Sequence, residues 1–150
     1  MDIATLEAEA ATLIFPSFTE STAWALGACL VAAAQADQLA VVINIRTPDR
    51  VLFHAALPGS APLNDAWIRR KSNTALLFQT ATLLVGTRNR ANGEGLDRHG
   101  LSPSDYADNG GAVPIRVQGV GVVACVTVSG LPQIEDHKLV VRAITEILAR

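Results

Sequence analysis

The chain has 150 residues, the length of one ordinary domain and enough to bury a hydrophobic core. Apolar residues make up 49% of it and charged residues 17%, a globular composition that excludes a disordered chain. The net charge of −2 gives no electrostatic case for nucleic-acid binding, which needs clustered Lys and Arg. No apolar run approaches the roughly 20 residues that span a membrane.

Cysteine usage and the first residues bear on the compartment. Cys29 and Cys125 lie inside apolar runs and form neither a disulfide framework nor the spacing of a metal site. The acidic, amphipathic N-terminus lacks the basic start of a signal peptide. We therefore expect a cytoplasmic protein without a metal centre. The low fraction of charge also favours a homo-oligomer that covers apolar surface.

The N-terminal third predicts two helices. Apolar residues at helical spacing mark a short helix over residues 2–13, with Glu7 and Glu9 facing solvent. This helix ends before Pro16, because proline disfavours helical backbone at the residue before it. A second helix begins near residues 17–19. It is apolar on nearly every face, so we expect it to be largely buried.

A hairpin follows the second helix. Residues 39–46 and 51–57 are rich in β-branched and aromatic side chains, and the Thr47–Pro48–Asp49 segment between them is a turn. His54 points to the face opposite Phe53. A lone histidine on such a strand is more often a packed or surface residue than a ligand.

The rest of the chain predicts a long helix, an exposed loop, one helical turn, two strands and a closing helix. Pro114 cannot donate to a strand ladder, so its strand lies at an edge or begins after the proline. The long helix begins at or just before Asn64, and an interruption is expected within it. The expected bounds are 64–90 for the long helix, with its break near 79–81, and 91–102 for the loop. They are 104–106 for the helical turn, 112–119 and 120–130 for the two strands, and 132–150 for the closing helix.

This order of elements indicates the fold class. Two hairpins separated by helices favour an antiparallel sheet with helices packed on both sides. No repeat, linker or low-complexity segment divides the chain. We therefore expect an α+β fold with a profilin-like layout, in a single domain over residues 1–150.

Lys71 falls on the apolar side of the long helix. With Trp67 taken as zero and 100° per residue, Phe78 lies at roughly 20° and Lys71 at roughly 40°. A lysine in the middle of an apolar stripe either extends along Trp67 to water or meets a buried carboxylate.

The closing helix carries the complementary residue. Asp136 falls on its buried side, His137 lies at the margin, and Glu135 and Lys138 face away. Both Asp136 and His137 lie in the first turn, where the helix dipole favours a negative charge.

These residues allow two interpretations. In one, Lys71, Asp136 and His137 line a ligand pocket with Ser129–Gly130 as its floor. In the other, Asp136 accepts amide hydrogen bonds at the helix start and pairs with Lys71, while His137 bonds to the backbone. No phosphate-binding glycine loop, nucleophile elbow or zinc spacing is present, so we assign no catalytic residue.

Three segments resemble a known family. NDAWIRRKSNT, DYADNGGAVPIRV and VSGLPQIEDHKLVV occur in this order. They resemble an uncharacterised branch of the HbpS/GlcG-like haem-degrading domain superfamily, from Phe15 to Leu148. The resemblance implies a profilin-like fold and a ring-like or stacked homo-oligomer, and it carries over no established reaction. The matching positions are Trp67, Lys71, Gly110, Gly111, Pro114, Ser129, Gly130, Leu131, Asp136 and His137.

The chain departs from the branch at Thr80–Ala81–Thr82, where serines are common. If those hydroxyls line a pocket, this chain lacks one of them at Ala81. Some members of the wider superfamily bind or degrade haem; His137 could serve as an axial ligand here, and the one Met and the one Tyr are the other available ligands.

Three functions follow as expectations. The leading one is small-molecule binding by a homo-oligomer; the alternatives are a haem-binding or haem-degrading protein and a purely structural or interaction protein. Whether the protein is an enzyme stays open. The candidate ligand site comprises Trp67, Lys71, Gly110, Gly111, Ser129, Gly130, Asp136 and His137.

Overall fold

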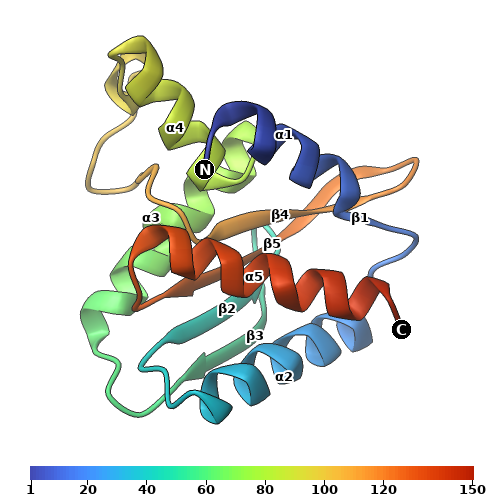
Figure 1. Cartoon of the computed structure of the whole chain (residues 1–150). Helices are drawn as coiled ribbons and strands as arrows, with labels where there is room; N and C mark the ends of the chain where they lie inside the picture. The colour runs from blue at the N-terminus through green and yellow to red at the C-terminus, as the bar shows by residue number, and fades with distance from the viewer.

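A five-stranded sheet forms the centre of the computed structural model, which describes all 150 residues (Figure 1). Its strands lie in the order β1-β4-β5-β2-β3. The strands are β1 (Ile14–Phe15), β2 (Val42–Arg46), β3 (Val51–Ala56), β4 (Ala112–Val117) and β5 (Gly121–Ser129). The helices are α1 (Ile3–Thr12), α2 (Glu20–Ala36), α3 (Pro62–Phe78), α4 (Thr82–Asn92), the short 3-10 helix η1 (Leu96–His99) and α5 (Gln133–Leu148).

The α+β prediction is confirmed, with one correction to the sheet. The β2–β3 and β4–β5 hairpins are antiparallel, and β2 also pairs antiparallel with β5. However, Ile14 and Phe15 form a short strand that pairs parallel with β4, so the sheet is mixed. A two-residue strand is too short to produce a periodic pattern, which is why the sequence did not predict it.

The expected break in the long helix is confirmed. Gln79 adopts a left-handed backbone with φ of 53° and ends α3, and α4 begins at Thr82. The predicted alternatives for the strand containing Pro114 are wrong, because β4 begins before the proline and lies second in the sheet; β1 pairs only with Arg116 and Val117, so Pro114 has no strand partner on that side. One further expectation is wrong: the stretch predicted to be a loop contains η1, which covers residues 96–99.

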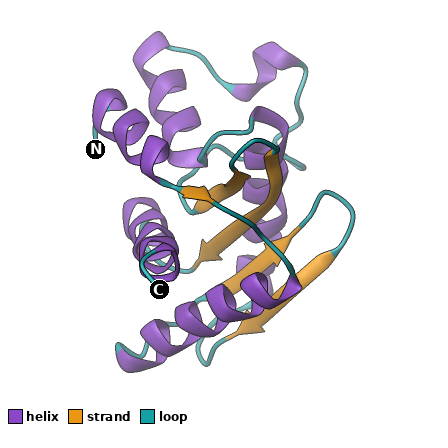
Figure 2. Ribbon diagram, turned by 90° about the vertical axis from the view of Figure 1, so that its right-hand side faces the viewer, coloured by secondary structure: helices purple, strands orange, loops and turns teal.

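Helices cover both faces of the sheet. Helices α2 and α5 pack on one face (Figure 2), where alternate strand residues such as Ile43, Ile115 and Val126 are wholly buried. The opposite face meets α3, where Cys125 packs with Ala75. Burial raises the pKa of the Cys125 thiol to about 11, so this thiol stays protonated at neutral pH.

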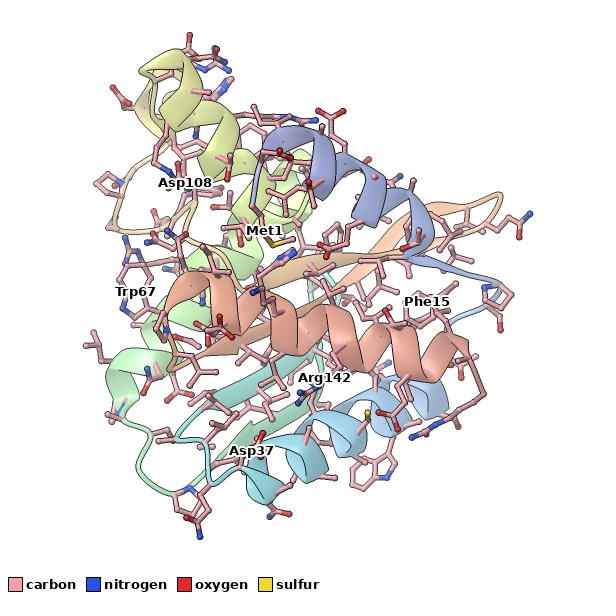
Figure 3. All side chains as sticks on the ribbon, in the orientation of Figure 1. Met1, Phe15, Asp37, Trp67, Asp108 and Arg142 are labelled. Carbon is pink, nitrogen blue, oxygen red and sulfur yellow. The ribbon has the colours of Figure 1, made fainter.

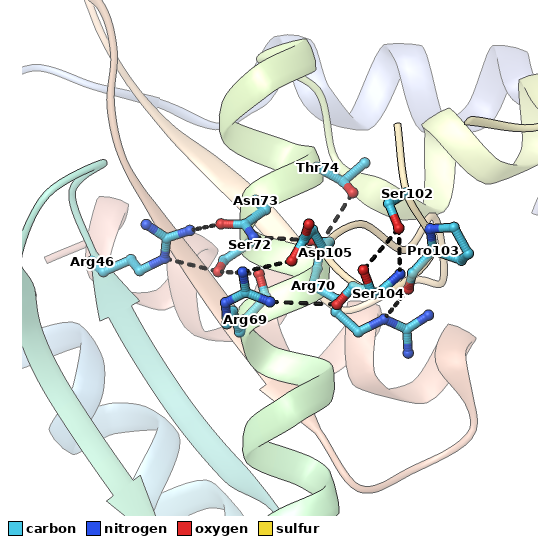
Figure 4. A network of polar contacts seen from close by, with 10 residues as sticks. All are labelled: Arg46, Arg69, Arg70, Ser72, Asn73, Thr74, Ser102, Pro103, Ser104 and Asp105. Carbon is cyan, nitrogen blue, oxygen red and sulfur yellow. Dashed lines mark hydrogen bonds and ion pairs between the residues drawn. The ribbon is translucent and has the colours of Figure 1, made fainter. Parts of the chain in front are cut away.

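The face against α3 is polar. The Arg46 guanidinium on β2 donates from Nε to Ser72 Oγ at 2.8 Å (Figure 4). Asn73 Nδ2 donates to Asp105 O at 2.9 Å, and Arg69 Nη2 lies 2.8 Å from the Asp105 carboxylate. These contacts fix the segment after residue 101 on α3, and this segment leads directly into the glycine turn at 109–111.

Helix α1 lies beside α4, away from the main core (Figure 1). Asp2 caps it, since Thr5 N donates to Asp2 Oδ1 at 2.8 Å. Leu6 is its only buried residue, and it packs with Leu83 and Leu84 in a cluster separate from the 20-residue core. None of the helices combines the length and apolar composition that crossing a membrane requires.

Candidate functional site

The Lys71 ammonium is buried and hydrogen-bonded on all sides. Only 2% of the residue is exposed. Its Nζ donates to Val128 O at 2.7 Å, to Gly110 O at 3.1 Å and to Asp136 Oδ2 at 3.3 Å. An ammonium group has three donors, so this group has no hydrogen left for a ligand.

The Asp136 carboxylate is equally occupied. Its Oδ2 accepts from Lys71, and its Oδ1 accepts from Leu131 N at 3.0 Å. Burial raises the pKa of Asp136, and burial lowers the pKa of Lys71, although the attraction between the two charges opposes both shifts. The amide bonds and the Lys71 pairing predicted for Asp136 are therefore present.

The glycines around this pair are required by close packing. At Gly111, where φ is +132°, a Cβ would lie 2.5 Å from Lys71 Nζ and 2.5 Å from Val128 O. At Gly130, where φ is +149°, a Cβ would lie 2.4 Å from Ala40 O. A side chain at either position would strain the backbone and collide with atoms that cannot move freely. The family motif at these positions thus has a structural explanation.

A polar pocket of about 280 Å³ lies over the Lys71–Asp136 pair. Asn64, Asn109 and Gln133 contribute amide groups to its wall. Trp67, labelled in Figure 3, also lines it, and the Arg70 guanidinium lies 4.4 Å from the Trp67 ring centroid. The pocket brings together six of the predicted site residues: Trp67, Lys71, Gly110, Ser129, Gly130 and Asp136.

His137 does not join this pocket. It is 1% exposed, and its Nε2 lies 2.5 Å from Glu9 Oε1 on α1. Its Nδ1 is buried and has no hydrogen-bond partner. The predicted marginal position and backbone bond of His137 are therefore wrong, as is the solvent-facing position of Glu9. Both errors arise because α1 folds back over the start of α5.

His137 instead lines a second cavity of about 250 Å³, which we call the α1 cavity. Its wall is built by α1, the α3–α4 junction, β4 and α5. Apolar side chains, among them Leu84, Val113 and Pro114, cover part of it. The ionisable residues that line it are Glu7, Glu9, Arg88, Arg116 and His137.

The charged groups of the α1 cavity come from distant parts of the chain. Arg88 Nη2 lies 3.3 Å from Glu7 Oε1, and Arg116 Nη2 donates to Gln79 O at 2.9 Å. The cavity also includes Ala81, which precedes α4 and provides no side-chain cap for that helix. No sequence pattern indicates that Glu9, Arg88 and Arg116 belong to a site, because their proximity depends on where α1 packs.

His54, predicted to be a packed or surface residue, lies at the surface. His54 Nε2 lies 3.0 Å from Asp65 Oδ1, and its Nδ1 lies 3.1 Å from Asn44 Nδ2. Its side chain is 40% exposed. No group of three or more His, Cys, Asp or Glu side chains is arranged to hold a metal ion.

Solved structures share this fold. The crystal structure of the Ybr137w protein superposes with a TM-score of 0.91 at 29% identity, covering 100% of this chain and 90% of that chain. HbpS superposes with a TM-score of 0.70 at 21% identity, covering 89% and 91% of the two chains. The PduOC:Heme complex gives 0.72 at 20% identity, covering 86% and 94%. At these lower identities, HbpS and PduOC show the fold alone.

Sequence comparison defines the family. The family described as "Haem degrading protein HbpS-like" matches residues 18–145. A UPF0303 protein of Streptomyces coelicolor is 49% identical over 147 residues, which are 97% of this chain and 93% of the relative. A UPF0303 protein of Paraburkholderia phymatum is 45% identical over 144 residues, 95% of this chain and 87% of the relative. The chain therefore belongs to the HbpS-like family, as the sequence motifs predicted.

The Lys71–Asp136 pair makes a prediction about stability. Lys71→Met leaves the Asp136 carboxylate buried without its cation, which should lower the free energy of unfolding at pH 7 by about 3–5 kcal/mol. Without Lys71 the carboxylate pKa is higher in the folded than in the unfolded chain, so folding takes up a proton. The loss should therefore shrink as the pH falls from 7 to 5.

Urea unfolding of both proteins at the two pH values measures this loss. The double variant Lys71→Met/Asp136→Asn removes the unpaired charge and should recover part of the stability. A loss below about 1 kcal/mol, or one independent of pH, would contradict the structural role of the pair.

Proposed function

We propose that the protein binds a small organic molecule in the α1 cavity. One observation carries the proposal: a cavity of about 250 Å³ is walled by apolar side chains together with the buried ring of His137, whose Nε2 is held by Glu9. The other ring nitrogen, Nδ1, is buried without a hydrogen-bond partner, which is rare in folded proteins. The mixed lining of apolar and charged groups is typical of small-molecule sites.

The size of the cavity limits the ligand. Drug-sized ligands occupy pockets of roughly 300–1,000 Å³. A cavity of about 250 Å³ therefore suits a molecule of few non-hydrogen atoms. Apolar contact with Leu84, Val113 and Pro114 would hold its carbon skeleton.

We assign a supporting role to the candidate residues around Lys71. A ligand that used the Lys71 ammonium would have to break a hydrogen bond to Val128 O, Gly110 O or Asp136. Breaking such a bond would leave a buried carbonyl or carboxylate oxygen without its donor, which costs about 1–3 kcal/mol. In this proposal Lys71, Asp136 and their glycines hold the start of α5, and that helix start presents His137 to the cavity.

Ala10→Trp tests the location of the site. Ala10 lies on α1, is exposed and lines the α1 cavity, so a tryptophan there can fill the cavity without disturbing the core. We expect small-molecule hits found by thermal-shift screening of the wild type to lose at least tenfold in affinity. The expected loss reflects the volume that the indole occupies.

The matched control is Ala8→Trp, which places the same side chain at an exposed position of α1 outside the cavity. This variant should bind as the wild type does. Hits that bind the Ala10→Trp protein with unchanged affinity would show that the ligand site lies elsewhere.

Haem is the second candidate ligand. It is favoured by the description of the family and by the heme complex of PduOC. The residues do not fit haem as they stand: the Nε2 of His137 is held by Glu9, its Nδ1 is enclosed, and the cavity of about 250 Å³ is smaller than sites for drug-sized ligands. Axial ligation needs an exposed ring nitrogen beside a slot that accepts the macrocycle.

We therefore expect haemin titration to give no Soret band that depends on His137. The measurement compares wild-type protein with His137→Ala, and uses His99→Ala, an exposed histidine outside the cavity, as control. A Soret shift present in the wild type and in His99→Ala, but absent in His137→Ala, would overturn this expectation.

A further inference from the structure

We infer that the α1 cavity takes a small organic acid, and that Glu7 and Glu9 of α1 occupy the places of its carboxylates. The inference rests on the proposed function and names the chemical class of the ligand. It starts from the distribution of charge in the cavity wall.

The acidic and the basic residues of the α1 cavity come from different helices and strands. Its two acidic residues, Glu7 and Glu9, both belong to α1. The ionisable residues contributed by the rest of the wall are Arg88 on α4, Arg116 on β4 and His137 on α5, and all three are basic. When α1 is set aside, the remaining wall is therefore a basic surface, which is complementary to an anion.

Both acidic residues of α1 already contact this basic wall. Glu7 Oε1 lies 3.3 Å from Arg88 Nη2, and Glu9 Oε1 lies 2.5 Å from His137 Nε2. Arg116 has no carboxylate partner, since its guanidinium donates to Gln79 O. Arg116 is thus a cation of the wall that no carboxylate of α1 pairs with. An arginine suits a carboxylate because its planar donors match the two oxygens.

Helix α1 is held lightly enough to yield to a ligand. Leu6 is the only residue of α1 that is buried, and its small cluster with Leu83 and Leu84 is separate from the main core. Ile3 of α1 is partly buried against the same cluster, and the other ties between α1 and the wall are the two carboxylate contacts. A ligand that supplies its own carboxylates can replace those contacts while the core stays intact.

Glu9→Gln tests the inference, because removing a competing carboxylate should strengthen binding of the ligand. We expect the affinity for short dicarboxylates (malonate, succinate and glutarate, measured by titration calorimetry) to rise about tenfold for the best of them, since a neutral amide competes less well for His137 than a carboxylate does. The uncharged analogue succinamide should bind neither protein measurably. Glu135→Gln, an exposed change outside the cavity, should behave as the wild type.

A second variant covers the case in which Glu9→Gln unfolds. Arg116→Gln removes a cation from the wall and should weaken acid binding at least tenfold. Equal or weaker acid binding by folded Glu9→Gln overturns the inference, as does unchanged binding by Arg116→Gln or the absence of any acid binding. If succinamide or amines bind instead, and Ala10→Trp abolishes that binding, the acid class fails while the proposed function stands.

Discussion

The Lys71 ammonium joins three segments that are far apart in the sequence. From α3 it donates to the end of β5 at Val128 O, to the glycine turn at Gly110 O and to the start of α5 at Asp136. A buried charge is tolerated only when its hydrogen bonds are all made, so the positions of these segments are mutually dependent. This explains why Gly111 has no side chain, since a Cβ there would lie 2.5 Å from Lys71 Nζ and 3.1 Å from the Asp136 Cβ.

The same constraint places His137. Asp136 and His137 are consecutive residues of α5, and consecutive side chains on a helix diverge by about 100°. Because Asp136 is fixed toward Lys71, His137 must point to a different side, which is where α1 and the α3–α4 junction enclose the α1 cavity. The pair therefore orients the residue that carries the proposed site without belonging to that site.

The Lys71–Asp136 pair and His137 differ in whether their polar atoms all have hydrogen-bond partners. Lys71 and Asp136 satisfy each other and the backbone, whereas His137 retains a buried nitrogen without a partner. A satisfied buried network rigidifies a structure, and a buried group without a partner costs free energy. This contrast supports the proposal that Lys71 belongs to the frame and that the ligand binds beside His137.

How much the sequence predicts depends on whether a property is local. Helical periodicity identified Lys71 and Asp136, and the strand patterns identified both hairpins, because each pattern repeats within a few residues. The two-residue strand at Ile14–Phe15 has no such repeat. The contact of Glu9 with His137 spans 128 residues and depends on how α1 packs against the rest of the chain. No local rule anticipates a contact of that kind.

Nitrogen NMR on the His137 ring and the Lys71 ammonium tests the central claim most directly. A buried, hydrogen-bonded ammonium exchanges slowly enough to be observed beside the imidazole nitrogens. During titration with the tightest-binding small molecule, the account predicts large shifts of the His137 nitrogens as Glu9 is displaced, and an unchanged Lys71 signal. A shift of the Lys71 ammonium with the His137 nitrogens unmoved would contradict it.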